Sequence, residues 1–91
     1  MYEWVLVTTD KRGVFFGKLA EHDNGTVVLT EARNCIYWSE QTKGFLGLAV
    51  TGPMDGSRIG PAVPEIRLYG VTSISKCSDE AVARWKEAPW S

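Results

Sequence analysis

The chain has 91 residues, enough for one domain with a modest core, and a formal net charge of −1 at neutral pH. A near-neutral chain has no overall attraction to nucleic acid or to an anionic membrane, and no segment approaches the ~18 consecutive apolar residues of a membrane span. We therefore expect a single domain over residues 1–91 in the cytoplasm, with Cys35 and Cys77 reduced and buried as small apolar side chains.

The first half of the chain predicts a series of β-strands. Residues 4–9 are rich in β-branched side chains, which favour strands. Residues 14–20 and 26–30 form a hairpin around Asp23-Asn24-Gly25, because Asn-Gly tolerates the positive φ angles of a tight turn. Residues 35–38, with two adjacent aromatic side chains, are the next β segment.

The second half mixes short elements with one long loop. Residues 45–49 have apolar side chains at the spacing of a short helix, and a short strand is the competing interpretation. Residues 51–64 are rich in Gly and Pro and form the longest irregular segment. Residues 65–77 predict a bent β segment, and residues 78–88 predict a helix that begins with a capping serine and two acidic residues.

These elements predict a mainly β fold, a small antiparallel barrel of five or six strands with a C-terminal α-helix. Gly17 and Gly70 lie within β segments, where a glycine permits a sharp bend or the close approach of a neighbouring strand. The segment with Gly17 and Leu29, followed much later by the segment around Gly70, resembles the two-part layout of Sm-like, SH3-like barrels. In that family the first part forms three strands and the second forms the last two. The family binds single-stranded RNA, but Tyr69 replaces the Arg expected beside Gly70, so the resemblance implies the fold and not the RNA-binding residues.

A second resemblance covers most of the chain and rests on a series of short motifs. They are Phe16-Gly17, Val27-Val28-Leu29, Ala32-Arg33, Tyr37-Trp38-Ser39, Leu48-Ala49 with Gly52, Val63-Pro64 with Ile66 and Leu68, and Val71, Ile74 and Cys77. In this order they resemble a family of small uncharacterised proteins encoded by bacteriophages and prophages. Such proteins often counter bacterial immunity. The resemblance therefore implies a phage accessory protein that antagonises a defence system in the host cytoplasm, by binding a defence protein or sequestering a nucleotide signal.

No set of residues in the sequence predicts an enzyme. His22 is the only histidine and lies in a hairpin turn, and the two cysteines lack the paired spacing of metal ligands. Asp79 and Glu80 are explained by the helix dipole at the start of a helix rather than by acid–base catalysis. We therefore expect no catalysis, no cofactor and no metal.

Binding is the chemistry that the sequence favours. The candidate ligand- or partner-binding residues are close together in the chain or lie in the Gly-rich loop: Arg33, Tyr37, Trp38, Lys43, Ser57 and Arg58. Aromatic faces stack on nucleobases, and arginines form paired hydrogen bonds to phosphate. The alternative is that the two aromatic residues belong to the core or to an interface and that the arginines are solvated. In that case the surface to search is the C-terminal helix, around Arg84, Lys86 and Trp90.

The sequence also predicts a homo-oligomer, with a dimer favoured. Four tryptophans exceed what so short a chain needs for its core, and a short barrel exposes edge strands. The opposing interpretation is that all four tryptophans pack in the core. The runner-up functions are an Sm-like barrel that binds single-stranded nucleic acid and a minor virion or assembly component. No membrane partner is expected.

Overall fold

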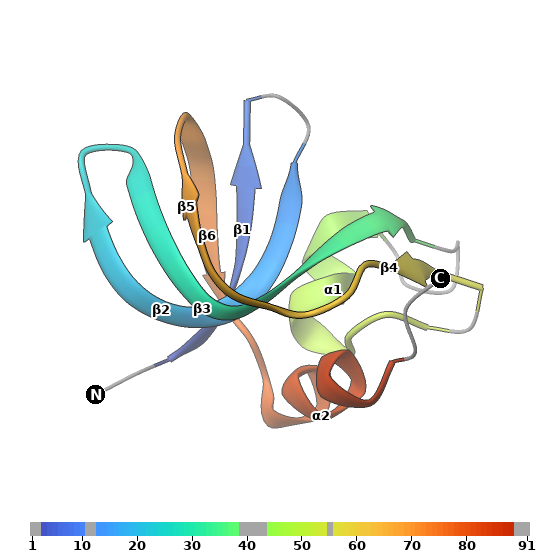
Figure 1. Cartoon of the computed structure of the whole chain (residues 1–91). Coiled ribbons are helices and arrows are strands. Elements are labelled where there is room, and N and C mark those ends of the chain that lie inside the picture. The colour runs from blue at the N-terminus through green and yellow to red at the C-terminus, as the bar shows by residue number, and fades with distance from the viewer. Residues whose placement is uncertain (1–2, 11–12, 39–43, 55, 89–91) are drawn as a thin grey trace.

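The computed structural model describes residues 3–10, 13–38, 44–54 and 56–88 (Figure 1). Its elements in chain order are β1 (Trp4–Thr9), β2 (Val14–Asp23), β3 (Thr26–Tyr37), α1 (Gly44–Val50), β4 (Arg58–Ile59), β5 (Val63–Leu68), β6 (Val71–Lys76) and α2 (Asp79–Glu87). A mainly β fold with a C-terminal helix is therefore confirmed. No helix in the described part of the chain is long and apolar enough to cross a membrane.

The strands form one antiparallel sheet. Its hydrogen-bonding order is β5–β3–β2–β1–β6, and β4 pairs with the far end of β3. Three strands come from the first part of the chain, and the last two are joined around Gly70, as the two-part layout predicts. The sheet curls strongly, because its two outermost strands, β5 and β6, meet at the short turn that joins them (Figure 1).

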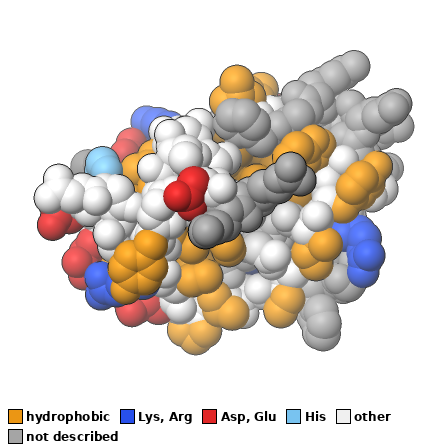
Figure 2. All heavy atoms as spheres, turned by 90° about the horizontal axis from the view of Figure 1, so that it is seen from above, with side chains coloured by type: hydrophobic (Ala, Val, Ile, Leu, Met, Phe, Trp, Pro, Cys, Tyr) orange, Lys and Arg blue, Asp and Glu red, His pale blue; other side chains and the backbone are white. Residues whose placement is uncertain are grey.

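The turns at one end of the curled sheet are tied together. Asn24 and Gly25 have φ angles of 46° and 82°, which confirms the hairpin turn between β2 and β3. The backbone N–H of Val71 donates to the carbonyl of Gly25 at 3.0 Å, and that of Asp10 donates to the carbonyl of Gly70 at 2.9 Å. Figure 2, seen from above, shows acidic and basic side chains gathered over the β2–β3 hairpin at this end.

Strand β3 is longer than the sequence predicted. Residues 26–30 and 35–38 were expected as separate segments, but Thr26–Tyr37 is one strand with a bulge in its middle. At the bulge Glu31 has a φ of 51°, an uncommon value for a residue with a side chain. A bulge keeps a strand paired while it bends, and for this reason the two predicted segments merge.

Gly17 lies opposite this bulge, in β2. A Cβ atom added there would lie 3.0 Å from the Cβ of Leu29 and 3.2 Å from the carbonyl oxygen of Thr30. The predicted close approach of strands at Gly17 is therefore confirmed. Gly70 differs from the prediction in detail, because it lies in the turn between β5 and β6, with a φ of 65°, rather than within one bent strand.

The curled sheet buries side chains on both faces. The inner face, which we call the barrel interior, contains Val5, Val7, Val27, Leu29, Ala32 and Leu68. The outer face, which we call the helix-covered face, packs against α1 and α2 and contains Leu6, Val14, Phe16, Cys35, Leu48, Ala49, Ile59, Cys77, Ala81 and Trp85. Figure 1 shows both helices on the same side of the sheet. Both cysteines are buried, as predicted.

The two helices end and begin where local signals predict. The helical interpretation of the segment near residue 45 is confirmed by α1, and the backbone N–H of Gly52, with a φ of 83°, bonds back to the carbonyl of Gly47 at 3.2 Å. The hydroxyl of Ser78 accepts a bond from the backbone N–H of Ala81 at 3.1 Å and so caps α2.

Candidate functional site: the corner where β3 meets β4

Two of the predicted site residues come together where β4 pairs with the end of β3. Tyr37 lies directly opposite Arg58 in this antiparallel pair, so both side chains project from the same face. Arg58 is exposed, and 54% of Tyr37 is exposed. Ile36 beside them is 51% exposed. We call these three residues the β3–β4 corner.

An irregularity in the strand pairing explains why two neighbouring apolar side chains are exposed there. Cys35 pairs with Ile59, and both are buried, but the register shifts between Cys35 and Tyr37. In a regular strand the side chains alternate between the two faces, and a bulge changes where they point. The shift therefore places Tyr37 in solvent, although Cys35, two residues earlier, is in the core.

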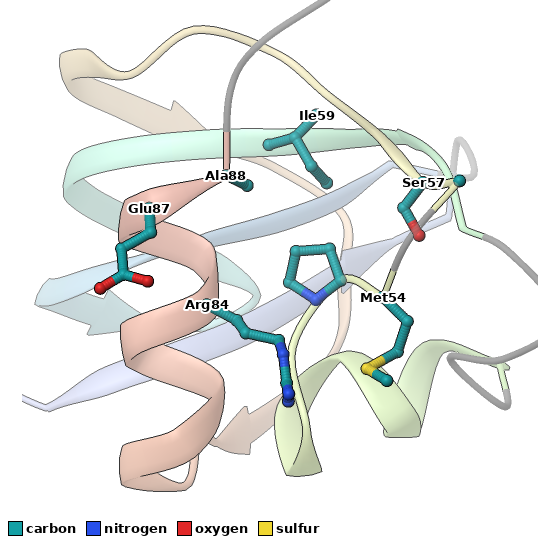
Figure 3. Close-up of a pocket in the computed structure, with 8 residues that line it drawn as sticks. Met54, Ser57, Ile59, Arg84, Glu87 and Ala88 are labelled. Atoms are coloured by element: carbon teal, nitrogen blue, oxygen red, sulfur yellow. The ribbon is translucent and has the colours of Figure 1, made fainter.

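Ser57 lies beside the corner but lines a separate pocket of about 290 Å³ between the loop and α2 (Figure 3). Met54 and Ser57 line it from the loop, and Arg84 and Glu87 line it from α2. The guanidinium of Arg84 donates to the carbonyl of Thr51 at 2.9 Å and pairs with Glu80 at 2.6 Å. Arg84 therefore holds the loop against the helix.

Arg33 has a structural position that the sequence did not indicate. Its residue is 7% exposed, and burial lowers the pKa of its guanidinium. Its Nε donates to the carbonyl of Gly60 at 2.9 Å, and its Nη1 donates to the carbonyls of Trp85 and Ala88, each at 2.6 Å. The partial negative charge at the C-terminus of a helix favours a cation there. Arg33 therefore anchors the end of α2 to β3 and does not join the β3–β4 corner.

Trp38 is also separate from the corner surface. Trp38 is half-buried and packs against the helix-covered face, where it borders a cavity of about 490 Å³ together with Thr8, Val14 and Ser73. Lys43 lies outside the described residues, as do Ser39, Pro89 and Trp90. The structure thus brings together Tyr37 and Arg58, places Ser57 next to them, and separates Arg33 and Trp38.

The helix-covered face also carries an aromatic stack that the sequence did not indicate. Phe16 stacks between Trp4 and Trp85, with ring centroids 5.1 Å and 4.9 Å apart and interplanar angles of 10° and 3°. The ammonium groups of Lys86 and Lys18 lie 4.3 Å and 5.3 Å from the centroid of the Trp4 ring. The only sequence signal was the alternation of β1, which places Trp4 on the same face as Leu6, together with Lys86 among the alternative residues of the C-terminal helix.

Comparison with known proteins assigns the chain to a family. Residues 2–85 match the model of a family described as a domain of unknown function, DUF6948. The chain belongs to the DUF6948 family. No curated protein and no solved structure matches it. The family description names no activity, so the surfaces of this DUF6948 domain are the guide to its function.

Burial sets the reactivity of the two cysteine thiols. Burial raises the pKa of the Cys35 thiol to about 11 and that of the Cys77 thiol to about 12, so both are protonated at neutral pH. A protonated thiol is a weak nucleophile. In the described part of this DUF6948 domain no group of three or more His, Cys, Asp or Glu side chains could hold a metal ion. The corner, with an aromatic ring, an alkyl side chain and a guanidinium, has the chemistry of a contact surface.

Proposed function

We propose that this DUF6948 protein is non-enzymatic and acts by binding another protein through the β3–β4 corner. The observation that supports this is the pairing of exposed Tyr37 with exposed Arg58 across β3 and β4, next to Ile36. Tyrosine and arginine are over-represented among the residues that dominate binding energy in protein interfaces. Both side chains stand on paired strands, so little order has to be gained on binding.

The side chains of the corner predict the chemistry of a complementary partner surface. Arg58 forms paired hydrogen bonds with a carboxylate, and Tyr37 and Ile36 fill an apolar depression beside it. The resemblance to phage-encoded proteins supports a bacterial defence protein as that partner, and the protein antagonises it by occupying a functional surface. The runner-up partner, a single-stranded nucleic acid, would meet Arg58 through phosphate, and its binding would weaken steeply with added salt.

The test measures binding to a host protein with corner variants. Protein retained from bacterial lysate by the wild-type domain is identified, purified and titrated against Arg58→Ala and Tyr37→Ala. We expect each variant to bind at least ~10-fold more weakly, while stability changes by no more than ~0.5 kcal/mol for Arg58→Ala because the side chain is exposed. Arg67→Ala, which removes another exposed arginine in β5, is the matched control. Full binding by a folded Tyr37→Ala/Arg58→Ala double variant would contradict the proposal.

We also propose that the protein forms a homodimer through the unpaired edges of its sheet. Within the described residues, β5 pairs with β3 alone and β6 pairs with β1 alone, so each strand has a free edge. Free edges are templates for pairing with a second chain. Light scattering is expected to give twice the 10.1 kDa of one chain. A mass of one chain at high micromolar concentration would rule this dimer out.

A further inference from the structure

A cavity of about 310 Å³ opens at the Trp4 end of the helix-covered face, and none of its lining residues belongs to the β3–β4 corner. It is lined by Trp4, Phe16, Glu31, Arg33, Ala62 and Lys86. Its size is at the lower end of the ~300–1,000 Å³ that small-molecule sites occupy. The residues come from β1, β2, β3, the segment before β5, and α2, so the folded chain assembles the cavity from segments far apart in sequence.

One wall of this cavity is the outer end of a stack of aromatic rings. Trp85 and Phe16 are fully buried, at 0% and 1% exposure, whereas Trp4 is half-buried. One face of the Trp4 indole packs on Phe16. The face turned away from Phe16 is the next position in the stack, and the ammonium group of Lys86 lies over it, 4.3 Å from the ring centroid. Planar rings stack on such a face almost independently of their identity.

The charges around the ring favour an anion. Three cations surround the cavity: Lys18 and Lys86 near the indole, and Arg33 in the lining. The one carboxylate in the lining, Glu31, is paired with Lys18 at 3.1 Å. In the part of the chain that the structure describes, neither Arg33 nor Lys86 pairs with a carboxylate. The cavity therefore has an excess of positive charge, part of it on a buried guanidinium.

The hydrogen bonds of Arg33 to the end of α2 hold Lys86 at the cavity. Arg33 bonds the carbonyls of Trp85 and Ala88, and these two residues flank Lys86 and Glu87 in the chain. These bonds fix the last turn of α2 against β3. The ammonium group at the end of the flexible Lys86 side chain can move aside from the indole and still reach an anion beside it.

We propose that this cavity binds a nucleoside monophosphate, with its base stacked on Trp4 and its phosphate held by Lys86 at the Arg33 side. The base displaces the Lys86 ammonium group from the outer face of Trp4, and the phosphate supplies the negative charge that the cavity lacks. This activity goes beyond the protein binding assigned to the β3–β4 corner, since the two surfaces share no residue.

The experiment is isothermal titration of the full chain with adenosine monophosphate at low salt, with tryptophan fluorescence recorded in parallel. We expect saturable binding of one nucleotide per chain together with a change in fluorescence. Adenosine, which lacks the phosphate, and inorganic phosphate, which lacks the base, should each bind at least ~10-fold more weakly, because each keeps only one of the two contacts.

Two matched lysine variants test the residue assignment. Lys86→Gln removes the charge at the cavity, whereas Lys76→Gln makes the same change in β6, where the lysine side chain is 76% exposed and pairs with Glu3. Lys86→Gln should weaken nucleotide binding roughly tenfold, and Lys76→Gln should change it less than about twofold. Arg58→Ala should leave it unchanged, which separates this site from the corner.

The ring is tested by Trp4→Leu and Trp4→Phe, with the melting temperature measured for both. Loss of binding in Trp4→Leu with recovery in Trp4→Phe is the expected result. The proposal is overturned if adenosine monophosphate shows no saturable binding at millimolar concentration, or if Lys86→Gln binds like the wild type. It is equally overturned if inorganic phosphate binds as well as the nucleotide, or if only an oligonucleotide binds.

Discussion

The two faces of the curved sheet are packed by different kinds of side chain. The barrel interior is aliphatic, with Val7 and Leu29 fully buried. The helix-covered face contains a stack of three aromatic rings, both cysteines, and the guanidinium of Arg33 close by. Aliphatic packing is non-directional, whereas ring stacking and hydrogen bonds require particular geometry. The stability of the barrel interior thus depends on how well side chains fill its volume. The stability of the helix-covered face depends also on how its rings and hydrogen-bonding groups are oriented.

This difference matters for function, because both proposed binding surfaces border the helix-covered face. The β3–β4 corner continues from Cys35 and Ile59, and the cavity beside Trp4 continues the aromatic stack. Directional contacts hold these surfaces in fixed positions, as specific recognition requires. Substitutions on each face, and a change of pH, test whether the two faces are distinct parts of the molecule.

Replacing Trp85 should separate the two faces most clearly. Trp85 is fully buried, stacks on Phe16, and its Nε1 donates to the carbonyl of Leu48 at 3.0 Å. Trp85→Ala should lower the free energy of unfolding by ~3–5 kcal/mol, measured by urea denaturation. Hydrogen exchange should accelerate in α2 much more than in β1 to β3, because the barrel interior loses no contact.

The control for this change is Trp85→Phe, which keeps a stacking ring but loses the indole hydrogen bond and part of the ring volume. It should cost ~1–3 kcal/mol, mainly because the carbonyl of Leu48 is left without its donor. Equal acceleration of exchange in α2 and in the central strands would show that the two faces unfold as one unit and are not distinct parts of the molecule.

Gly17 tests the barrel interior in the same way. Gly17→Ala would place its Cβ 3.0 Å from that of Leu29 and within 3.3 Å of backbone atoms of Thr30 and Ala32, so the neighbouring strand would have to shift. We expect a loss of ~1–3 kcal/mol from overpacking, read from the urea midpoint. Gly25→Asn is the control, since no atom lies within 4 Å of a Cβ there and asparagine tolerates its positive φ. A Gly17→Ala protein as stable as the control would contradict the claim that the barrel interior is sensitive to added volume.

The features that the sequence predicted correctly are those set by local chemistry. Asn24-Gly25 specifies a hairpin turn through its backbone preferences, and Ser78 caps a helix through a bond three residues away. The close approach at Gly17 was also predicted, because a glycine inside a regular strand commonly marks a bend or a near neighbouring strand. Such signals need only a few neighbouring residues, so one sequence is enough to read them.

The features that the sequence did not predict depend on contacts between distant segments. The bulge at Glu31 lies opposite Gly17 in β2, and β4 is defined by its pairing with β3. Arg33 looked like a surface cation, since its carbonyl partners lie 27 to 55 residues further along the chain. The stack of Trp4, Phe16 and Trp85 was hidden for the same reason. Of the candidate site, only the meeting of Tyr37 with Arg58 followed from residues that the sequence had selected.

The smallest effect concerns pH, and it too should belong to the helix-covered face. Both thiols lie in that cluster, and burial raises the pKa of Cys35 to about 11 and that of Cys77 to about 12, from an ordinary value of 9.0. The folded state therefore keeps both thiols neutral, whereas the unfolded chain releases their protons above about pH 9. The stabilisation from the neutral thiols is complete below that pH and is lost as the pH rises toward the folded-state values.

At about pH 9.5 each thiol should have reduced the free energy of unfolding by about 1 kcal/mol or less, which urea denaturation between neutral pH and pH 10 can resolve. A Cys35→Ala/Cys77→Ala variant is the control, because it keeps every lysine and tyrosine that titrates in the same range. Its stability at neutral pH is expected to be lower, but its decline above about pH 9 should be shallower than that of the wild type. Parallel curves for the two proteins would mean that the cysteines are not held neutral by the fold. The helix-covered face would then lose the one alkaline sensitivity that distinguishes it from the aliphatic interior, which has no titrating side chain in its buried cluster.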